Sequence, residues 1–393
     1  ELAKAAMKRT ISYLASDALG GRETATEGER LAAVYIEQQF DSLGLQRMGD
    51  SAHFEQAFTF AAPPVLGAKN SLQVGRNTLR LGVDYYPVSY SASGVVFTKL
   101  ARCSYGMIAP ETGRNDFDGV DVKEHAAAIC VSSPDGIHPH SKWIEHHDLG
   151  ARINDAIKLG AKAVLLYNDD ATAEDPDSTL SKKIKPCDVP VVFLKKSGFA
   201  KPGLDGNPVV IQVSIERGQL TGHNLIGFLD NGQPNTVVIG AHYDHLGHGI
   251  EGTLWRGDPA IHNGADDNAS GVAMVLQLAK DLRDRPSAKH NNFLFMAFSG
   301  EELGLYGSNW WTKHPTYPLE KVNYMINLDM VGRLDTNNTI AIGGVGTSPS
   351  WARLRPNADS TASAKRKPRM KPGKEPPATL KVKTTESGVG PSD

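Results

Sequence analysis

The chain has 393 residues, of which 40% are hydrophobic and 22% are charged, a composition typical of globular proteins. Its formal net charge of −2 gives no global basic field that would attract nucleic acid. No apolar run approaches the ~18–20 residues of a membrane-spanning helix, so membrane-spanning, collagen-like and mostly disordered classes are excluded. A single domain usually has about 100–200 residues, and the length therefore predicts two domains or one domain with a large insertion.

The N-terminal part predicts two helices. Residues 2–14 contain no Pro or Gly, and Met7, Ile11 and Leu14 recur on one side of a helix. A turn-rich break follows at residues 17–26, and a second helix leads to Phe40 and ends in the way that a left-handed glycine cap would end it, at Gly44.

From about Asp84 to about Ile215, short apolar runs alternate with turns rich in Pro, Gly and Asp. The three cysteines of the chain lie here and are too few for a disulfide framework. One helical segment, at residues 149–159, interrupts the pattern. We expect a compact, strand-rich domain at 84–215, inserted into a discontinuous main domain made of residues 1–83 and 216–393.

The region from 224 to 346 predicts an α/β domain. Continuous apolar strands alternate with helices there, which favours a mixed, mostly parallel sheet sandwiched by helices. The expected strands are 236–241, 293–298, 322–328 and 339–342, and the expected helices are 269–282 and 302–313. Farther on, residues 365–383 carry eight Lys or Arg against one Glu, with four prolines, and predict a solvated segment rather than a nucleic-acid tail.

Residues that can bind metal follow the ends of several predicted strands. In open α/β sheets, ligands bind at the carboxyl ends of strands. Taken singly, a histidine at a strand end, paired glutamates at a helix start or aspartates in a turn are more often structural. Their occurrence together favours a metal site. These residues are His242, Asp244, Asp266, Asp267, Glu301, Glu302 and Asp329.

The mixture of imidazole and carboxylate suits Zn²⁺, with Mn²⁺ or Co²⁺ as alternatives. The carboxylates outnumber the needs of one zinc, which predicts two ions about 3.5–4 Å apart with a bridging carboxylate. Asp266 is the expected bridge because it lies in the loop between ligand-bearing strands, whereas Asp267 can cap the following helix. Asp244, two residues after His242, is expected to accept the second ring N–H of that histidine. One of the two adjacent glutamates can ligate while the other acts as a general base.

The four motifs together resemble the co-catalytic di-zinc aminopeptidases, a family that also contains glutamate carboxypeptidase and the transferrin receptor ectodomain. Residues 14–22 and 35–45 resemble its bacterial secreted members, and 84–215 is similar to the protease-associated domain often inserted there. The motifs lie at residues 242–245, 264–271, 299–304 and 327–332.

The resemblance implies a role for each position. His242 and Asp329 would hold one zinc, Asp266 would bridge, and Glu302 would hold the other zinc. Glu301 would be the general base, and the bond between Asp266 and Asp267 would be cis. The implied activity is that of an aminopeptidase on a peptide substrate. A carboxypeptidase or glutaminyl cyclase of the same fold, and a non-catalytic receptor-like protein, stay as alternatives.

Both ends of the chain depart from the expected pattern. The fifth ligand of the family is a histidine near the C-terminus, but no histidine follows His314, and the chain stops at Asp393. We expect a C-terminally truncated and impaired enzyme with one incomplete zinc site. The chain begins at Glu1 without Met, and we expect a secreted or periplasmic protein from which a signal peptide has been removed. The oligomeric state is left open.

Overall fold

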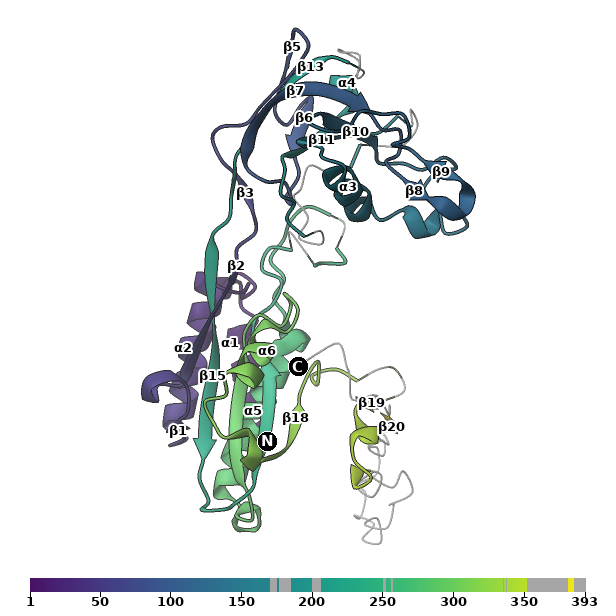
Figure 1. The fold of residues 1–393 in the computed structure, drawn as a ribbon. Helices are drawn as coiled ribbons and strands as arrows, with labels where there is room; N and C mark the ends of the chain where they lie inside the picture. The colour runs from purple at the N-terminus through teal and green to yellow at the C-terminus, as the bar shows by residue number, and fades with distance from the viewer. Residues whose placement is uncertain are drawn as a thin grey trace. The chain divides into compact units, whose positions relative to one another are not determined.

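The computed structural model divides the chain into two compact units (Figure 1). The first unit comprises Glu1–Phe60 and Leu220–Asp393, and the second comprises Ala61–Gln219. The expected insert lies within the second unit, and its assignment as a protease-associated domain stays a prediction. The structure describes residues 1–169, 175–176, 185–199, 206–249, 252–255, 257–334, 336, 338–351 and 381–384. Most of the basic Pro-rich segment at 365–383 therefore lies outside the described residues.

The first unit is built on a mixed six-stranded sheet, which confirms the predicted mixed α/β class, although parallel pairs do not outnumber antiparallel pairs as expected. The sheet has the strand order β1-β15-β17-β16-β18, and β2 also pairs with β15. β16 runs parallel to both β17 and β18, whereas β15 is antiparallel to β17. The strands are β1 (Gln46–Arg47), β2 (Glu55–Ala61), β15 (Gln219–Leu229), β16 (Thr236–His242), β17 (Asn292–Phe298) and β18 (Val322–Asn327).

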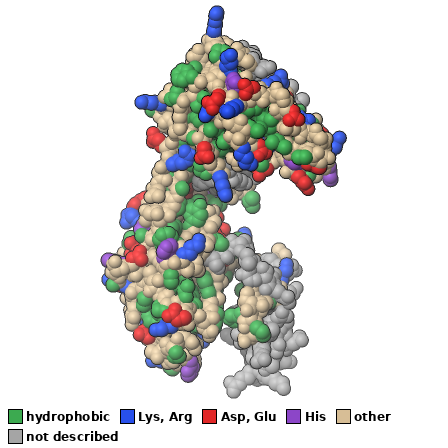
Figure 2. Space-filling view, in the orientation of Figure 1, with side chains coloured by type: hydrophobic (Ala, Val, Ile, Leu, Met, Phe, Trp, Pro, Cys, Tyr) green, Lys and Arg blue, Asp and Glu red, His purple; other side chains and the backbone are tan. Residues whose placement is uncertain are grey.

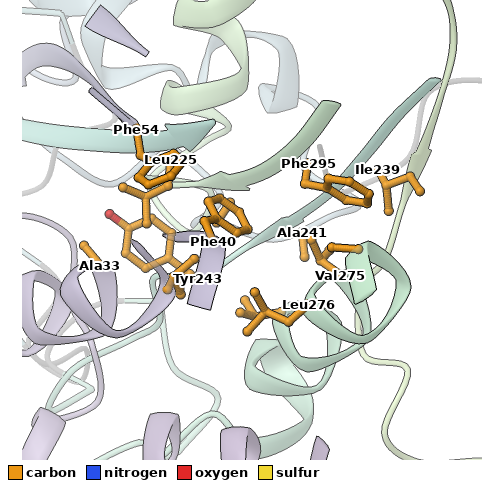
Figure 3. Close-up of a cluster of buried hydrophobic side chains, with 14 of the residues drawn as sticks. Ala33, Phe40, Phe54, Leu225, Ile239, Ala241, Tyr243, Val275, Leu276 and Phe295 are labelled. Atoms are coloured by element: carbon orange, nitrogen blue, oxygen red, sulfur yellow. The ribbon is translucent and has the colours of Figure 1, made fainter. Parts of the chain in front are cut away.

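Helices cover both faces of this sheet. Side chains of α1 (Leu2–Leu14), α2 (Glu27–Ser42) and α5 (Gly271–Asp284) pack on one face, and α6 (Tyr306–Lys313) contributes Trp311 to the other. Successive residues of a strand point to opposite faces. In β16, Ile239 and Ala241 therefore lie in the core with α2 and α5 (Figure 3), whereas Val238 lies with Trp311. Burial on both sides explains why the central strands are continuously apolar.

Two helix boundaries depend on left-handed residues. The predicted glycine cap is confirmed, because α2 ends at Ser42 and Gly44 has a φ of 68°. The helix expected from Glu302 instead begins at Tyr306, since Gly304 and Leu305 have φ values of 109° and 62° and form a turn. The glutamates at 301 and 302 consequently lie in a turn rather than on a helix.

Two strand assignments differ from the prediction. Residues 339–342 do form a strand, β19 (Thr339–Ile342), but it pairs with β20 (Lys381–Thr384) in a separate two-stranded sheet rather than in the main sheet. β15 was not predicted, because Gly222 and Gly227 interrupt its apolar pattern. A Cβ at Gly227 would lie 2.9 Å from the Leu45 side chain and 3.1 Å from the Phe40 ring of α2, so glycine allows close packing there.

The second unit has an eight-stranded sheet with the order β5-β4-β13-β7-β10-β11-β12-β6. Ala128 of β10 packs in a core on one face, and Ala127 packs with α3 (Leu149–Lys158) on the other. The sheet strands are β4 (Ser71–Val74), β5 (Asn77–Leu79), β6 (Tyr85–Pro87), β7 (Gly94–Arg102), β10 (Ala126–Cys130), β11 (Ala163–Tyr167), β12 (Val191–Leu194) and β13 (Pro208–Val213). The smaller elements are β3 (Val65–Leu66), β8 (Ile108–Ala109), β9 (Arg114–Asn115), β14 (Ile215–Glu216) and α4 (Lys196–Phe199).

Charges of both signs are mixed on the surface of the second unit that Figure 2 shows. On that face, no broad patch of Lys and Arg stands apart from the acidic side chains. Within the described part of the chain, no helix combines the length and apolar character needed to cross a bilayer.

Candidate metal centre

Histidine and carboxylate side chains meet at one edge of the sheet in the first unit. His242 is the last residue of β16, Glu301 and Glu302 follow β17, and Asp329 follows β18. These three strands are parallel to one another, so their carboxyl ends share an edge. Asp267 joins them from a short π-type turn, Ala265–Ser270, that precedes α5. The prediction that strand-end residues converge here agrees with this arrangement.

The first candidate metal group consists of His242, Asp267 and Asp329. The Nε2 atom of His242 lies 3.2 Å from Asp267 Oδ1 and 3.4 Å from Asp329 Oδ1. Asp329 Oδ1 is buried and makes no hydrogen bond. A buried carboxylate oxygen without a donor is costly, and a cation between these atoms would satisfy it. The donor set therefore fits a divalent metal.

The second candidate group consists of His245, Asp267 and Glu302. The Nδ1 atom of His245 lies 2.6 Å from Glu302 Oε1 and 4.0 Å from Asp267 Oδ1. Asp267 thus belongs to both groups, as a bridging carboxylate of a two-metal site would. Mixed imidazole and carboxylate ligation in both groups suits zinc.

His245 was missed as a candidate ligand. If β16 continued through residue 245, its side chain would point away from those of His242 and Asp244. The strand ends at His242, however, and the following residues no longer alternate. The backbone N–H of His245 donates to the carbonyl of Arg22 over 3.0 Å, and this hydrogen bond holds His245 at the site. The signal in the sequence was that His245 belongs to the same motif as His242. Its side chain can turn toward the site only because β16 ends at His242.

Asp266 does not occupy the bridging position that was predicted for it. Asp266 Oδ1 accepts a hydrogen bond from the Gly332 N–H over 2.9 Å, and Oδ2 lies 3.4 Å from Arg333 Nε. Neither metal group contains it, and Asp267 occupies the shared position instead. Asp267 is also not the helix cap that it could have been, since α5 begins only at Gly271. The cis peptide bond joins Asp267 to Asn268, one residue later than expected.

Asp244 holds the glutamate turn and also lies beside the histidine ring. Its carboxylate accepts hydrogen bonds from the backbone N–H groups of Glu301 (3.1 Å) and Glu302 (3.3 Å) and from Thr24 Oγ1 (2.9 Å). The expected contact with His242 is longer, at 3.7 Å between Nδ1 and Oδ1, and Nδ1 lies 3.2 Å from the Asp244 carbonyl oxygen. Asp244 therefore positions both glutamates through their backbone.

The electrostatics of the site favour a cation. Burial lowers the pKa of His242, but the carboxylates of Asp244, Asp267 and Asp329 outweigh burial and hold that pKa well above its usual value. Burial raises the pKa of Asp267, but the hydrogen bond to His242 and the charges of His242, His245 and Arg22 together outweigh burial and lower that pKa. The acidic cluster thus draws positive charge to this edge, and a bound metal would take the place of the histidine proton.

Glu301 lies beside the first group without belonging to it. Its Oε2 atom is 3.9 Å from His242 Nε2, and its side chain is 11% exposed. Glu302 takes the ligand position of the pair. A carboxylate that neighbours a metal site but is not one of its ligands can accept and donate protons there.

One family model matches this part of the chain. Residues 224–376 match the model described as peptidase family M28. The matched range contains every candidate ligand and Glu301. It also contains β16, β17 and β18, which position these residues.

Curated relatives are named as aminopeptidases. Aminopeptidase YwaD of Bacillus subtilis is 31% identical over 186 residues, which cover 46% of this chain and 36% of that protein. A probable lipoprotein aminopeptidase, LpqL of Mycobacterium tuberculosis, is 24% identical over 315 residues, which cover 79% of this chain and 55% of that protein. The chain thus spans about a third to about half of the length of these relatives.

A solved structure shares the fold. The crystal structure of BSAP, a zinc aminopeptidase from Bacillus subtilis, superposes with a TM-score of 0.50 at 24% identity. The match covers 99% of this chain and 80% of that one.

Proposed function

We propose, on the premise that residues 224–376 belong to peptidase family M28, that the chain is part of a zinc-dependent exopeptidase that removes N-terminal residues from peptides. The observation that carries this proposal is the pair of metal groups that share Asp267, with Glu301 beside them. In this proposal, His242, Asp267 and Asp329 hold one zinc, and His245, Asp267 and Glu302 hold the other.

The residues around the metals would do the proton chemistry. Bound zinc would supply Lewis acidity, which polarises a peptide carbonyl and makes a water molecule more acidic. Glu301 would take a proton from the attacking water and return it to the leaving nitrogen. Asp244 would keep Glu301 in place, because it accepts the backbone N–H of that residue.

The charge of the site supports an aminopeptidase over a carboxypeptidase. A terminal carboxylate is best bound by Arg or Lys, whereas a free amine suits a site rich in carboxylates. Arg22 and Arg333 lie near the site, but carbonyl oxygens occupy the guanidinium of Arg22, and Arg333 faces Asp266. The relatives named above are also called aminopeptidases. Glutaminyl cyclase and receptor-like readings of the fold stay alternatives without an observation that favours them.

The test uses the protein that contains this chain, loaded with zinc. We expect it to release the first residue from a leucyl peptide and to leave the N-acetylated form of the same peptide intact. A chelator should abolish the release. Two bound zinc ions without hydrolysis of any amino-terminal, carboxy-terminal or glutaminyl substrate would contradict the enzyme proposal and favour a binding protein.

We further propose that the protein acts outside the cytoplasm. The support is one relative named as a lipoprotein aminopeptidase. Fractionation of cells that express the full gene should place the protein in the medium or periplasm, and recovery in the cytoplasmic fraction alone would contradict this. We also propose that residues 84–215, within the second unit, form a protease-associated-type domain, which a structure-based comparison of that unit alone would test.

A further inference from the structure

Arg22 is buried and donates hydrogen bonds to four backbone carbonyl groups. Its Nε donates to Tyr243 over 2.9 Å, and its Nη1 and Nη2 donate to Asn263 (2.8 Å) and Gly264 (3.0 Å). Nη1 also donates to the carbonyl of Leu14, at the end of α1. The guanidinium is a planar fork with five donors, and no other side chain can join so many acceptors at once.

The carbonyl groups that Arg22 joins lie next to metal-group residues. Tyr243 stands between His242 and Asp244, directly after β16. Asn263 and Gly264 precede Asp267 in the loop that leads to α5. Arg22 therefore fastens the backbone beside one ligand of the first group to the backbone just before the ligand that both groups share.

Neighbours of Arg22 strengthen the same connection. The carbonyl of Gly21 accepts the Gly247 N–H over 3.1 Å, and Thr24 Oγ1 donates to Asp244. A Cβ at Gly21 would lie 2.4 Å from the Gly247 carbonyl oxygen and 2.7 Å from that of His262, so the two backbones meet too closely for any other residue. The segment 21–24 is thus packed against the strand end and the loop that carry metal-group residues.

The charge of Arg22 also suits this position. Burial lowers the pKa of its guanidinium to about 10, and the carboxylates of Asp244, Asp267 and Glu302 oppose that decrease. The group therefore stays positively charged at neutral pH. A buried cation without acceptors would be strongly destabilising, and the four carbonyl groups and the nearby carboxylates remove that cost.

We propose that Arg22 is a positioning residue of the metal centre, which sets zinc affinity by holding the Asp267 loop against the end of β16. Arg22 contacts no metal-group side chain in this scheme and acts through the backbone. The inference rests on the proposed zinc site. Its readout is zinc affinity, so a protein that binds zinc but hydrolyses no peptide would refute the proposed function and leave this inference standing.

The chain offers a matched control in the second unit. Arg152 is also buried and donates to four carbonyl groups, those of Tyr105, Cys130, Val131 and Ser132, within 3.2 Å. Each variant keeps the positive charge and removes the planar guanidinium. Arg22→Lys does so in the first unit, and Arg152→Lys does so in the second. Loss of a group that orients metal ligands typically weakens metal binding about 10- to 100-fold. We expect this loss for Arg22→Lys and an unchanged zinc affinity for Arg152→Lys, measured by competition with a chromogenic chelator. The melting temperature of the metal-free protein should decrease in both variants.

Several outcomes would overturn the proposal. They are wild-type zinc affinity in folded Arg22→Lys, an equal loss in Arg152→Lys, or a wild-type chain that binds no zinc. Arg22→Met distinguishes charge from geometry, because tighter zinc binding in Arg22→Met than in Arg22→Lys would mean that charge repulsion dominates.

If the Arg22 variants do not fold, Asn263→Ala tests the same loop with Arg22 intact. This variant removes the 2.8 Å bond from Asn263 Nδ2 to Asp17 Oδ1, a second connection between the N-terminal segment and the loop. Weaker zinc binding in Asn263→Ala supports the positioning role. Unchanged binding in Asn263→Ala, together with unfolded Arg22 variants, would show that Arg22 serves the fold alone and would overturn the proposal.

Discussion

The two units are built on the same principles but differ at the ends of their strands. Each has a sheet whose central strands are buried on both faces, and each buries an arginine that donates to four carbonyl groups. Arg22 fastens the strand end and the loop of the first unit, and Arg152 fastens the loop after β10 in the second. These shared features stabilise both units, and by themselves they do not distinguish the unit that carries the metal groups from the unit that does not.

The difference lies in the side chains at the carboxyl ends. In the first unit, imidazole and carboxylate groups meet there and form two candidate metal groups. In the second unit, β10 ends at Cys130, whose Sγ donates to Asp169 Oδ1 over 3.0 Å. Burial raises the pKa of this thiol to about 11, so it stays protonated and is a poor metal ligand. The carboxyl end of a parallel strand is thus a position where a ligand can bind, and the residues that follow the strand decide whether a metal site forms there.

The largest effect should come from Glu301→Gln in the first unit. Removal of a general base typically lowers the rate about 10²- to 10⁴-fold, and we expect such a loss of peptide hydrolysis with unchanged zinc content. Cys130→Ser at the matching strand end of the second unit should leave activity unchanged. Substantial activity in Glu301→Gln, or loss of activity in Cys130→Ser, would break the contrast between the two units.

Asp267→Asn and Asp266→Asn form a matched pair of adjacent residues. Asp267 belongs to both metal groups, so its replacement should reduce zinc from two ions to one at most. Asp266→Asn should retain both ions, because an amide oxygen can still accept the Gly332 N–H. Zinc content determined by atomic emission on dialysed protein checks the pair. The opposite pattern would restore Asp266 as the bridge.

A smaller effect is expected for His245→Ala, which removes one ligand from the second group only. About one zinc ion should be lost, while the group of His242, Asp267 and Asp329 keeps its zinc ion. His262→Ala is the control, since its ring centroid lies 6.5 Å from that of His245 and it belongs to neither group. Equal zinc content in His245→Ala and wild type would exclude His245 as a ligand.

The smallest effect concerns pH and Glu29. Burial, with a contribution from Asp244, raises the pKa of Glu29 to about 8, although Ser299 and the Ala25 N–H donate to its carboxylate. An acid with a raised folded-state pKa favours the folded state below its unfolded pKa, and this stability is lost as the pH rises toward 8. Wild type should therefore lose stability relative to Glu29→Gln between pH 5 and 8, by on the order of 1 kcal/mol or more. Denaturant unfolding at both pH values checks this, and a constant difference would contradict it.

The sequence by itself determined the fold class, the central strands and the kinds of residue at the site. Buried parallel strands are continuously apolar, and the edge where they end is the same for all of them, so His242, Glu302 and Asp329 could be placed together from the chain alone. The antiparallel strand β15 could not be predicted because its glycines interrupt the apolar pattern. They lie where other segments pack closely: Gly227 lies against Phe40 of α2, and Gly222 lies against Phe58 and Ser299.

Only the tertiary structure decided which neighbouring residues belong to the candidate metal groups. The choice of Asp267 over Asp266 depends on the non-helical backbone at Asp267 and Asn268, and the inclusion of His245 depends on where β16 ends. Arg22 reaches Tyr243 across 221 positions of sequence. Periodicity describes one element at a time, whereas these features depend on backbone groups that meet only after distant segments have packed together.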